Sequence, residues 1–165
     1  MQNTNGRNSV GTPARSNEVI AHDVAVVLNA DLHEKTKRAV VKNAAWAWTE
    51  ASGKYEGCEL WSAAARELHR AADRKGRFQG LNHEHAVPIQ AFFNFLLQLP
   101  KGVSEQTVFD LFSHCMKGVV ITEDEHKRLN RKFKDKMPED FDFLSGNALA
   151  RYEACEITIG PAADC

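Results

Sequence analysis

A strongly amphipathic apolar repeat after Pro88 is the feature that most constrains the fold of this chain. The apolar residues follow the i, i+3, i+4, i+7, i+8 spacing of one helical face: Ile89, Phe92, Phe93, Leu96 and Leu97. This spacing predicts a helix with one buried side, and Pro100 and Gly102 end it. A second helix is predicted from Ser104 to about Gly118. The two together predict a helical hairpin with aromatic residues in the core.

Helical spacing and capping residues predict five more helices. They cover residues 18–29, 32 to about 52, 62 to about 75, a helix that starts at Thr122, and 147–154. Asp31 is the expected N-cap of the second, with Glu34 three residues later and Gly53 as the stop. Two short strands are predicted, one that ends at Pro88 and one at 119–121, where β-branched residues follow one another. The fold class is therefore α+β and predominantly helical.

Length and composition indicate one soluble globular domain. The chain has 165 residues, of which 43% are hydrophobic and 26% charged, the usual balance for a folded domain. No run approaches the ~18 apolar residues of a membrane span, and no apolar core of a signal peptide precedes residue 17. The four cysteines form no CxxC pair, which favours reduced thiols and a cytoplasmic protein.

The densest chemistry lies in residues 81–89, where His83, Glu84 and His85 stand between apolar residues and Pro88 follows. A matching second part lies downstream. There Thr122 and Glu125 form a capping box, which fixes the helix start and places His126 near its first turn. His126 and Asn130 are four residues apart, so they lie on one face of that helix.

These two parts resemble the HNH, or His-Me finger (ββα-metal), endonucleases, over residues 81–89 and 119–130 only. The resemblance implies a small ββα-metal core within a helical domain, and a hydrolase that cuts phosphodiester bonds in DNA. His85 would be the general base that activates water. Glu84, His126 and Asn130 would hold a divalent metal, Mg²⁺ first, with Mn²⁺ or Zn²⁺ as alternatives. His83 shares a strand face with His85, so either histidine remains open as the base.

Composition and length, together with the resemblance, predict a division of the chain. Residues 1–16 are expected to be a disordered tail, and 17–165 one domain. Within it, 17–77 would be a helical part, 78–136 the ββα-like part with a helical insertion at 88–118, and 137–165 a C-terminal helix and tail. The insertion departs from the compact family pattern and leaves the middle Asn of the HNH signature unassigned.

Two basic clusters are candidate contacts for nucleic acid. They flank the two parts of the site and comprise Arg70, Arg74, Lys75, Arg77, Lys127, Arg128 and Arg131. Cations in the last turn of a helix also complement its dipole, so a purely structural explanation is available. The formal net charge is −1, which does not by itself indicate a nucleic-acid partner.

Two other interpretations remain open. The chain could be a non-catalytic helical module that binds a protein or nucleic acid without any metal, which the near-neutral charge favours. A zinc site built from His83, His85 and His126 is the other, because imidazole-rich ligation suits zinc. Substrate preference and oligomeric state are not readable from the sequence.

Overall fold

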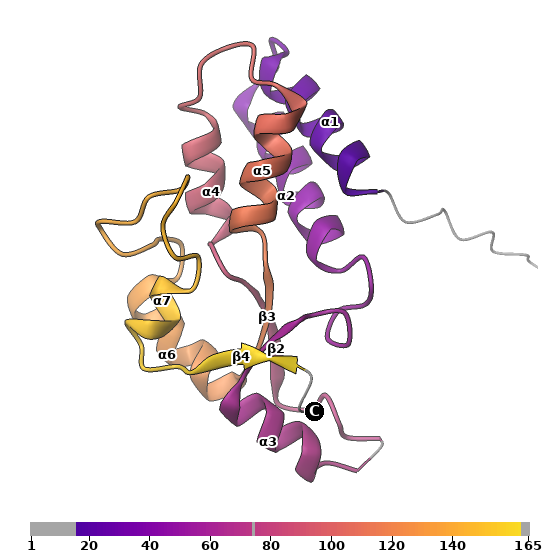
Figure 1. Ribbon diagram of the computed structural model, residues 1–165, viewed down its shortest axis with the longest axis vertical. Helices are drawn as coiled ribbons and strands as arrows, with labels where there is room; N and C mark the ends of the chain where they lie inside the picture. The colour runs from indigo at the N-terminus through magenta and orange to yellow at the C-terminus, as the bar shows by residue number, and fades with distance from the viewer. Residues whose placement is uncertain (1–15, 74, 163–165) are drawn as a thin grey trace, which may run out of the picture.

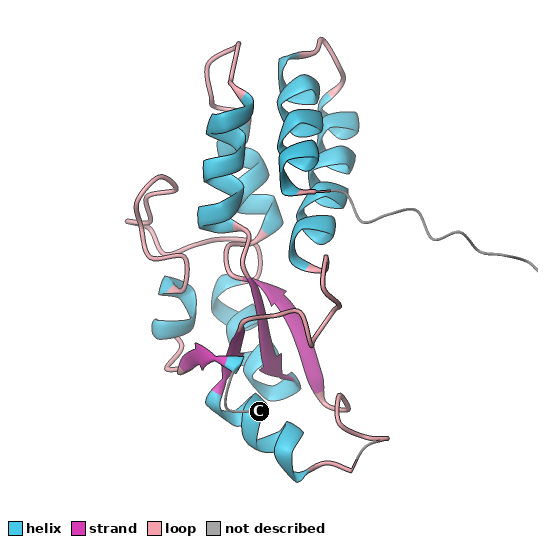
Figure 2. Ribbon diagram, turned by 45° about the vertical axis from the view of Figure 1, so that its right-hand side comes forward, coloured by secondary structure: helices cyan, strands magenta, loops and turns pink. Residues whose placement is uncertain are grey.

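Four helices form a bundle at one end of the molecule, and a small mixed sheet with three further helices forms the other end (Figure 1, Figure 2). The computed structural model describes residues 16–73 and 75–162. The predicted tail up to residue 15, together with Arg74 and Cys165, lies outside the described residues. Ser16 is the N-cap of the first helix.

The bundle consists of α1 (Asn17–Asn29), α2 (Glu34–Thr49), α4 (Ile89–Leu96) and α5 (Glu105–Cys115). Around the sheet lie α3 (Ala63–Ala71), α6 (Glu123–Phe133) and the short α7 (Ala150–Glu153). The strands are β1 (Leu60–Ser62), β2 (Leu81–His85), β3 (Gly118–Thr122) and β4 (Ile159–Pro161). The α+β, largely helical class predicted from the sequence is confirmed.

The sheet has the order β2-β3-β1-β4, so β2 and β4 are its edges. β2 runs antiparallel to β3, β3 parallel to β1, and β1 antiparallel to β4. The sequence analysis missed β1 and β4, because strands of three residues carry too few side chains to show an alternating pattern. The predicted first strand is shorter than expected, since β2 ends at His85 rather than at Pro88.

The bundle core forms from the apolar faces that the sequence predicts. Phe92, Phe93 and Leu96 of α4 are buried, as are four residues of α5, namely Val108, Leu111, Phe112 and Cys115. The two helices of the predicted hairpin, α4 and α5, also pack against the two N-terminal helices. α5 packs most closely against α1, and α4 lies nearer to α2. Leu97 falls after the end of α4 and is exposed.

Three local expectations are corrected. His33, not Asp31, is the N-cap of α2, where its Nδ1 accepts a hydrogen bond from the backbone N–H of Lys35 at 3.2 Å. α3 ends at Ala71, not near Lys75, and its buried residue is Ala65. The last helix, α7, begins at Ala150 instead of Asn147. None of the described helices is long and apolar enough to cross a membrane.

Ser62 connects the centre of the sheet to two helices. Its hydroxyl accepts a hydrogen bond from the backbone N–H of Ala65 at 3.0 Å, which caps α3, and donates one to Glu125 Oε2 at 2.6 Å. Glu125 is buried near the start of α6. The hydroxyl is therefore both a helix cap and a link between α3 and α6.

We expect Ser62→Ala to lower the free energy of unfolding by about 2–3 kcal/mol. Roughly 1 kcal/mol would come from the lost cap and the rest from a buried carboxylate that loses one donor. Ser104→Ala is the matched control, because Ser104 caps α5 at an exposed position and should cost only about 1 kcal/mol. Urea denaturation of both variants measures the difference. Equal losses would show that the link to Glu125 contributes nothing.

Candidate functional site

The site is built where β2 lies against β3 and β3 runs directly into α6. The capping box predicted at the start of α6 is present. Thr122 Oγ1 accepts from the backbone N–H of Glu125 at 3.2 Å, and the backbone N–H of Thr122 donates to Glu125 Oε2 at 2.9 Å. In the register of the two strands, Glu84 lies opposite Val119 and His85 opposite Gly118. Strand, strand and helix therefore follow the ββα order.

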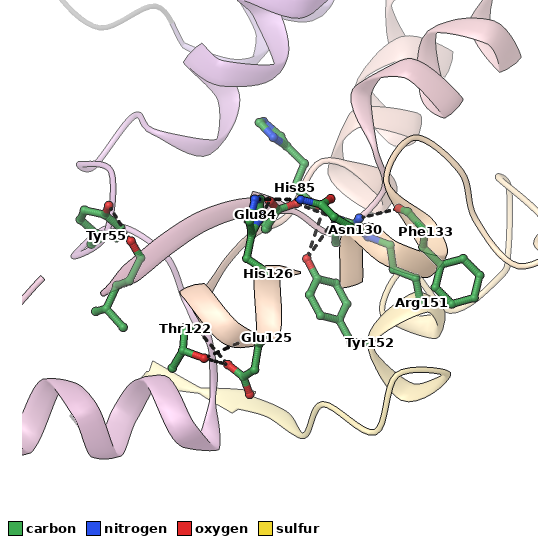
Figure 3. A network of polar contacts seen from close by, with 12 residues as sticks. Tyr55, Glu84, His85, Thr122, Glu125, His126, Asn130, Phe133, Arg151 and Tyr152 are labelled. Atoms are coloured by element: carbon green, nitrogen blue, oxygen red, sulfur yellow. Dashed lines mark hydrogen bonds and ion pairs between the residues drawn. The ribbon is translucent and has the colours of Figure 1, made fainter. Parts of the chain in front are cut away.

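Glu84, His126 and Asn130 meet on one side of β2 (Figure 3). Glu84 Oε1 lies 2.6 Å from His126 Nδ1, and Asn130 Nδ2 lies 2.8 Å from His126 Nε2. His126 Nδ1 is inaccessible to solvent and makes no hydrogen bond of acceptable angle within the described part of the chain. The carboxylate and this nitrogen are nevertheless within ion-pair distance of each other.

Arg151 is a site residue that the sequence analysis did not find. Its side chain is 1% exposed, and its guanidinium donates to Glu84 Oε2 at 3.0 Å. It also donates to three backbone carbonyls and one hydroxyl, those of His85, Ala86, Phe133 and Tyr152. An arginine with this many fixed acceptors holds the end of β2, the end of α6 and the Glu84 carboxylate in one arrangement.

His83 and His85 occupy the other face of β2, against α2. His85 Nε2 lies 3.3 Å from the carbonyl oxygen of Ala45 and 3.2 Å from Thr49 Oγ1. The edge of its ring meets Trp46 at a centroid distance of 4.4 Å. Figure 3 shows the His85 ring pointing away from Glu84 and His126. Adjacent residues of a strand point to opposite faces, which explains the separation.

Burial sets the protonation of both histidines. It lowers the pKa of His85 to about 4, with a smaller contribution from the positive charge of a protonated His83. Burial also lowers the pKa of His83, against the opposing effect of Glu50, whose Oε1 lies 3.2 Å from His83 Nδ1. The His83 side chain has no exposed surface, and His85 is only 5% exposed. His85 is therefore a buried residue and not one that stands open to solvent at the end of its strand.

A hollow of about 360 Å³ lies beside the edge strand β2, and we call it the β2 hollow. Because β2 is an edge strand, residues of both of its faces reach this hollow. Its lining comes from α2, β2, the start of α4 and the chain after α6, and includes Arg38, Lys42, Trp46, Glu84, His85, Ile89 and Lys134. A second hollow, of about 640 Å³, lies on α6 and is lined by Asp124, His126, Lys127, Asn130 and Arg131.

The described candidate nucleic-acid residues fall into three places. Lys127 and Arg131 line the hollow on α6 beside His126, and Lys127 also pairs with Asp124 at 3.1 Å. Arg128 lines a third hollow between α3 and α6. Arg70, Lys75 and Arg77 belong to the end of α3 and the loop after it, at the tip of the molecule away from the bundle (Figure 1). Arg77 pairs with Glu56 and lies over the Phe78 ring.

The three imidazoles of the zinc interpretation do not converge. His83 and His85 lie against α2, whereas His126 lies on the other side of β2 against Glu84. Among the described residues, no group of three or more His, Cys, Asp or Glu side chains is placed to hold a metal ion. The strongest donor pair is Glu84 with His126, and Asn130 adds an amide.

Comparison of the chain with known proteins gives no match to a family model, to a curated protein or to a solved structure. The resemblance to HNH endonucleases therefore stays a prediction from residues 81–89 and 119–130.

Proposed function

We propose that this chain is a metal-dependent endonuclease that hydrolyses phosphodiester bonds in DNA, with β2, β3 and α6 as its catalytic core. The observation that supports it most is the pair of Glu84 Oε1 and His126 Nδ1, which are 2.6 Å apart. The nitrogen is buried and lacks a well-angled hydrogen bond within residues 16–73 and 75–162. A carboxylate and an imidazole nitrogen held this close share a cation, which is a proton on Nδ1 until a metal ion displaces it.

The donor set fits a divalent cation of the Mg²⁺ or Mn²⁺ type. A carboxylate oxygen is the preferred ligand of Mg²⁺, and one imidazole beside it suits Mn²⁺ as well. A cation bound by few protein groups would neutralise charge that develops on the scissile phosphate. Glu84 and His126 are the residues that would hold it. Arg151 fixes the other oxygen of Glu84 and so orients the carboxylate.

Asn130 has a different role in this proposal from the one that the resemblance implies. Its amide contacts His126 Nε2, whereas Glu84 faces Nδ1. The two ring nitrogens point in diverging directions, so one cation at Nδ1 is out of reach of an amide at Nε2. The amide nitrogen of Asn130 donates to Nε2, which places the ring proton on Nδ1, toward Glu84. A metal ion at Nδ1 would move that proton to Nε2, where the turned amide oxygen of Asn130 would accept it. Asn130 therefore selects the tautomer of His126 and orients its ring.

His85 is the base in this proposal, because it lines the β2 hollow together with Glu84 although the two side chains lie on opposite faces of β2. Its Nε2 faces the carbonyl of Ala45, which places the ring proton there and leaves Nδ1 to accept a proton from water. With a pKa lowered to about 4 by burial, the ring is neutral at neutral pH. It is a weaker base than an exposed histidine for the same reason. His83 is unsuited, because its side chain has no exposed surface.

The test is cleavage of plasmid and oligonucleotide DNA by the purified protein with Mg²⁺, Mn²⁺ or EDTA. We expect metal-dependent cutting that falls by at least about 100-fold in Glu84→Gln and His126→Ala. His22→Ala is the matched control, because His22 and Glu105 form a similar pair, 2.7 Å apart, on the exposed surface. Manganese binding, followed by electron paramagnetic resonance, should be lost in the same two variants and kept in the control.

Folding controls accompany these variants. His85→Asn is preferable to His85→Ala for the base, because a buried imidazole that is packed against Trp46 would leave a cavity. Thermal unfolding of each variant separates a loss of chemistry from a loss of structure. No cutting with any metal, together with no bound Mn²⁺, would refute the proposal.

One observation favours the alternative of a non-catalytic binding module. Glu84 is already paired with a buried arginine, so its charge is compensated without a metal. On that alternative the network around Arg151 serves the fold alone. This alternative requires that the chain binds DNA or a protein equally well with and without EDTA, and that it does not cleave DNA.

A further inference from the structure

We propose that the β2 hollow receives one unpaired nucleotide, so that the chain binds single-stranded or locally unpaired DNA in preference to a duplex. The inference deepens the proposed nuclease function by naming its substrate class. Binding of DNA is tested separately from its cleavage. It rests on the size of the hollow, its lining and its position beside Glu84.

The size and walls of the hollow suit one nucleotide. About 360 Å³ lies at the lower end of the range for small-ligand sites. Trp46 contributes an aromatic ring that contact with His85 holds in place, and Ile89 adds an apolar side chain. Bases stack on such surfaces without regard to sequence. In an intact duplex the bases are stacked inside and do not reach a side hollow.

Cations line the same hollow. Arg38 is held in position, since it donates to Glu34 at 3.0 Å and to Gln90 and lies over the Phe93 ring. Lys42 and Lys134 are exposed and form no ion pair with any other described residue. The acidic residues of the lining are Asp135 and Glu84, and Arg151 compensates the latter. The lining therefore favours a phosphate.

Glu84 belongs both to the lining of the β2 hollow and to the candidate metal pair. Glu84 lines the β2 hollow, while its close neighbour His126 lines the hollow on α6 together with Lys127 and Arg131. A single strand that crosses the Glu84–His126 pair thus meets cations on both sides. With one nucleotide in the β2 hollow, the adjoining phosphate lies at the pair. A flexible single strand can follow this path more readily than a stiff duplex.

The experiment measures binding of a short labelled oligothymidylate, alone and paired with its complement, by fluorescence anisotropy in EDTA. We expect the single strand to bind more tightly. Lys42→Ala and Lys134→Ala should each weaken that binding about fivefold at ~0.1 M salt and lower the salt slope by about 0.7. Lys101→Ala removes the same charge from an exposed position outside the hollow and should change neither quantity.

A second variant tests the hollow without a change of charge. Ile89→Trp fills the space and should weaken binding of the single strand while duplex binding stays the same. Equal affinity for both DNA forms, or lysine variants that match Lys101→Ala, would overturn the inference. Lysine-dependent binding of the single strand without cleavage in any metal would support this inference and refute the nuclease. Metal-dependent cutting without preference for a single strand would support the nuclease and refute this inference.

Discussion

We expect Arg151→Met to lower the free energy of unfolding by about 3–5 kcal/mol. This is the largest loss of stability that we expect from any single substitution. The guanidinium is buried and bonds to the Glu84 carboxylate and to the carbonyls of His85, Ala86 and Phe133. Its removal leaves a carboxylate without its cation and carbonyls without donors. Breaking a buried charge pair from one side typically costs this much. Urea denaturation at neutral pH measures it.

Two comparisons make the result specific to the network. Arg66→Met removes an arginine that bonds to the carbonyls of Trp61 and Pro161 at a less buried position, and should cost only about 1 kcal/mol. The double variant Glu84→Gln with Arg151→Met should lose less stability than the two single variants added together, because the two residues act on one another. If Arg151→Met loses no more than Arg66→Met, the network does not stabilise the fold.

The free energy of unfolding should also fall by about 3 kcal/mol as the pH decreases from about 6.5 to 4. Burial lowers the pKa of His85 from 6.5 to about 4, so within this window the unfolded chain binds a proton that the folded chain does not. Stability therefore decreases as the pH falls, and the effect of this residue is complete below pH 4. The pKa of His83 is lowered too, which acts in the same direction.

The measurement is urea denaturation at several pH values for the unmodified chain and for His85→Gln, which cannot take up the proton. The glutamine variant will be less stable at neutral pH, because the imidazole packing is lost. Its stability should nevertheless decline less steeply below pH 6.5, so the two curves approach each other toward pH 4. Parallel curves would show that His85 titrates in the folded chain as it does in the unfolded one.

Local features of the site were readable from the sequence. Ser62, Ser104 and Thr122 cap the helices expected of them, because capping depends on side chains within three residues. Glu84 and His126, which the resemblance places in one site, lie 2.6 Å apart, and Asn130 contacts His126. The spacing within α6 explains the second contact, whereas the first depends on the pairing of β2 with β3, about 30 residues apart in the chain.

Contacts between distant segments were not readable. Arg151 reaches Glu84 across 67 positions, and nothing near residue 151 distinguishes it from an arginine in an exposed helix. The alternation along β2 predicts that His83 and His85 share a face, but not that α2 covers it. That cover decides whether His85 is exposed, and hence its pKa. Helix and strand propensities and residue spacing depend on neighbours in the chain, so they do not predict which distant helix packs against a strand face.

The place of β1 in the sheet has a consequence for how the chain matures on the ribosome. β1 is an inner strand, and its antiparallel partner β4 joins it by pairing Leu60 with Pro161, about 100 residues later. Such long-range pairing slows folding. Until translation passes that point, the nascent chain carries β1 with one edge unpaired and Glu84 without Arg151. Chaperones that shield exposed strand edges would be needed most in that interval.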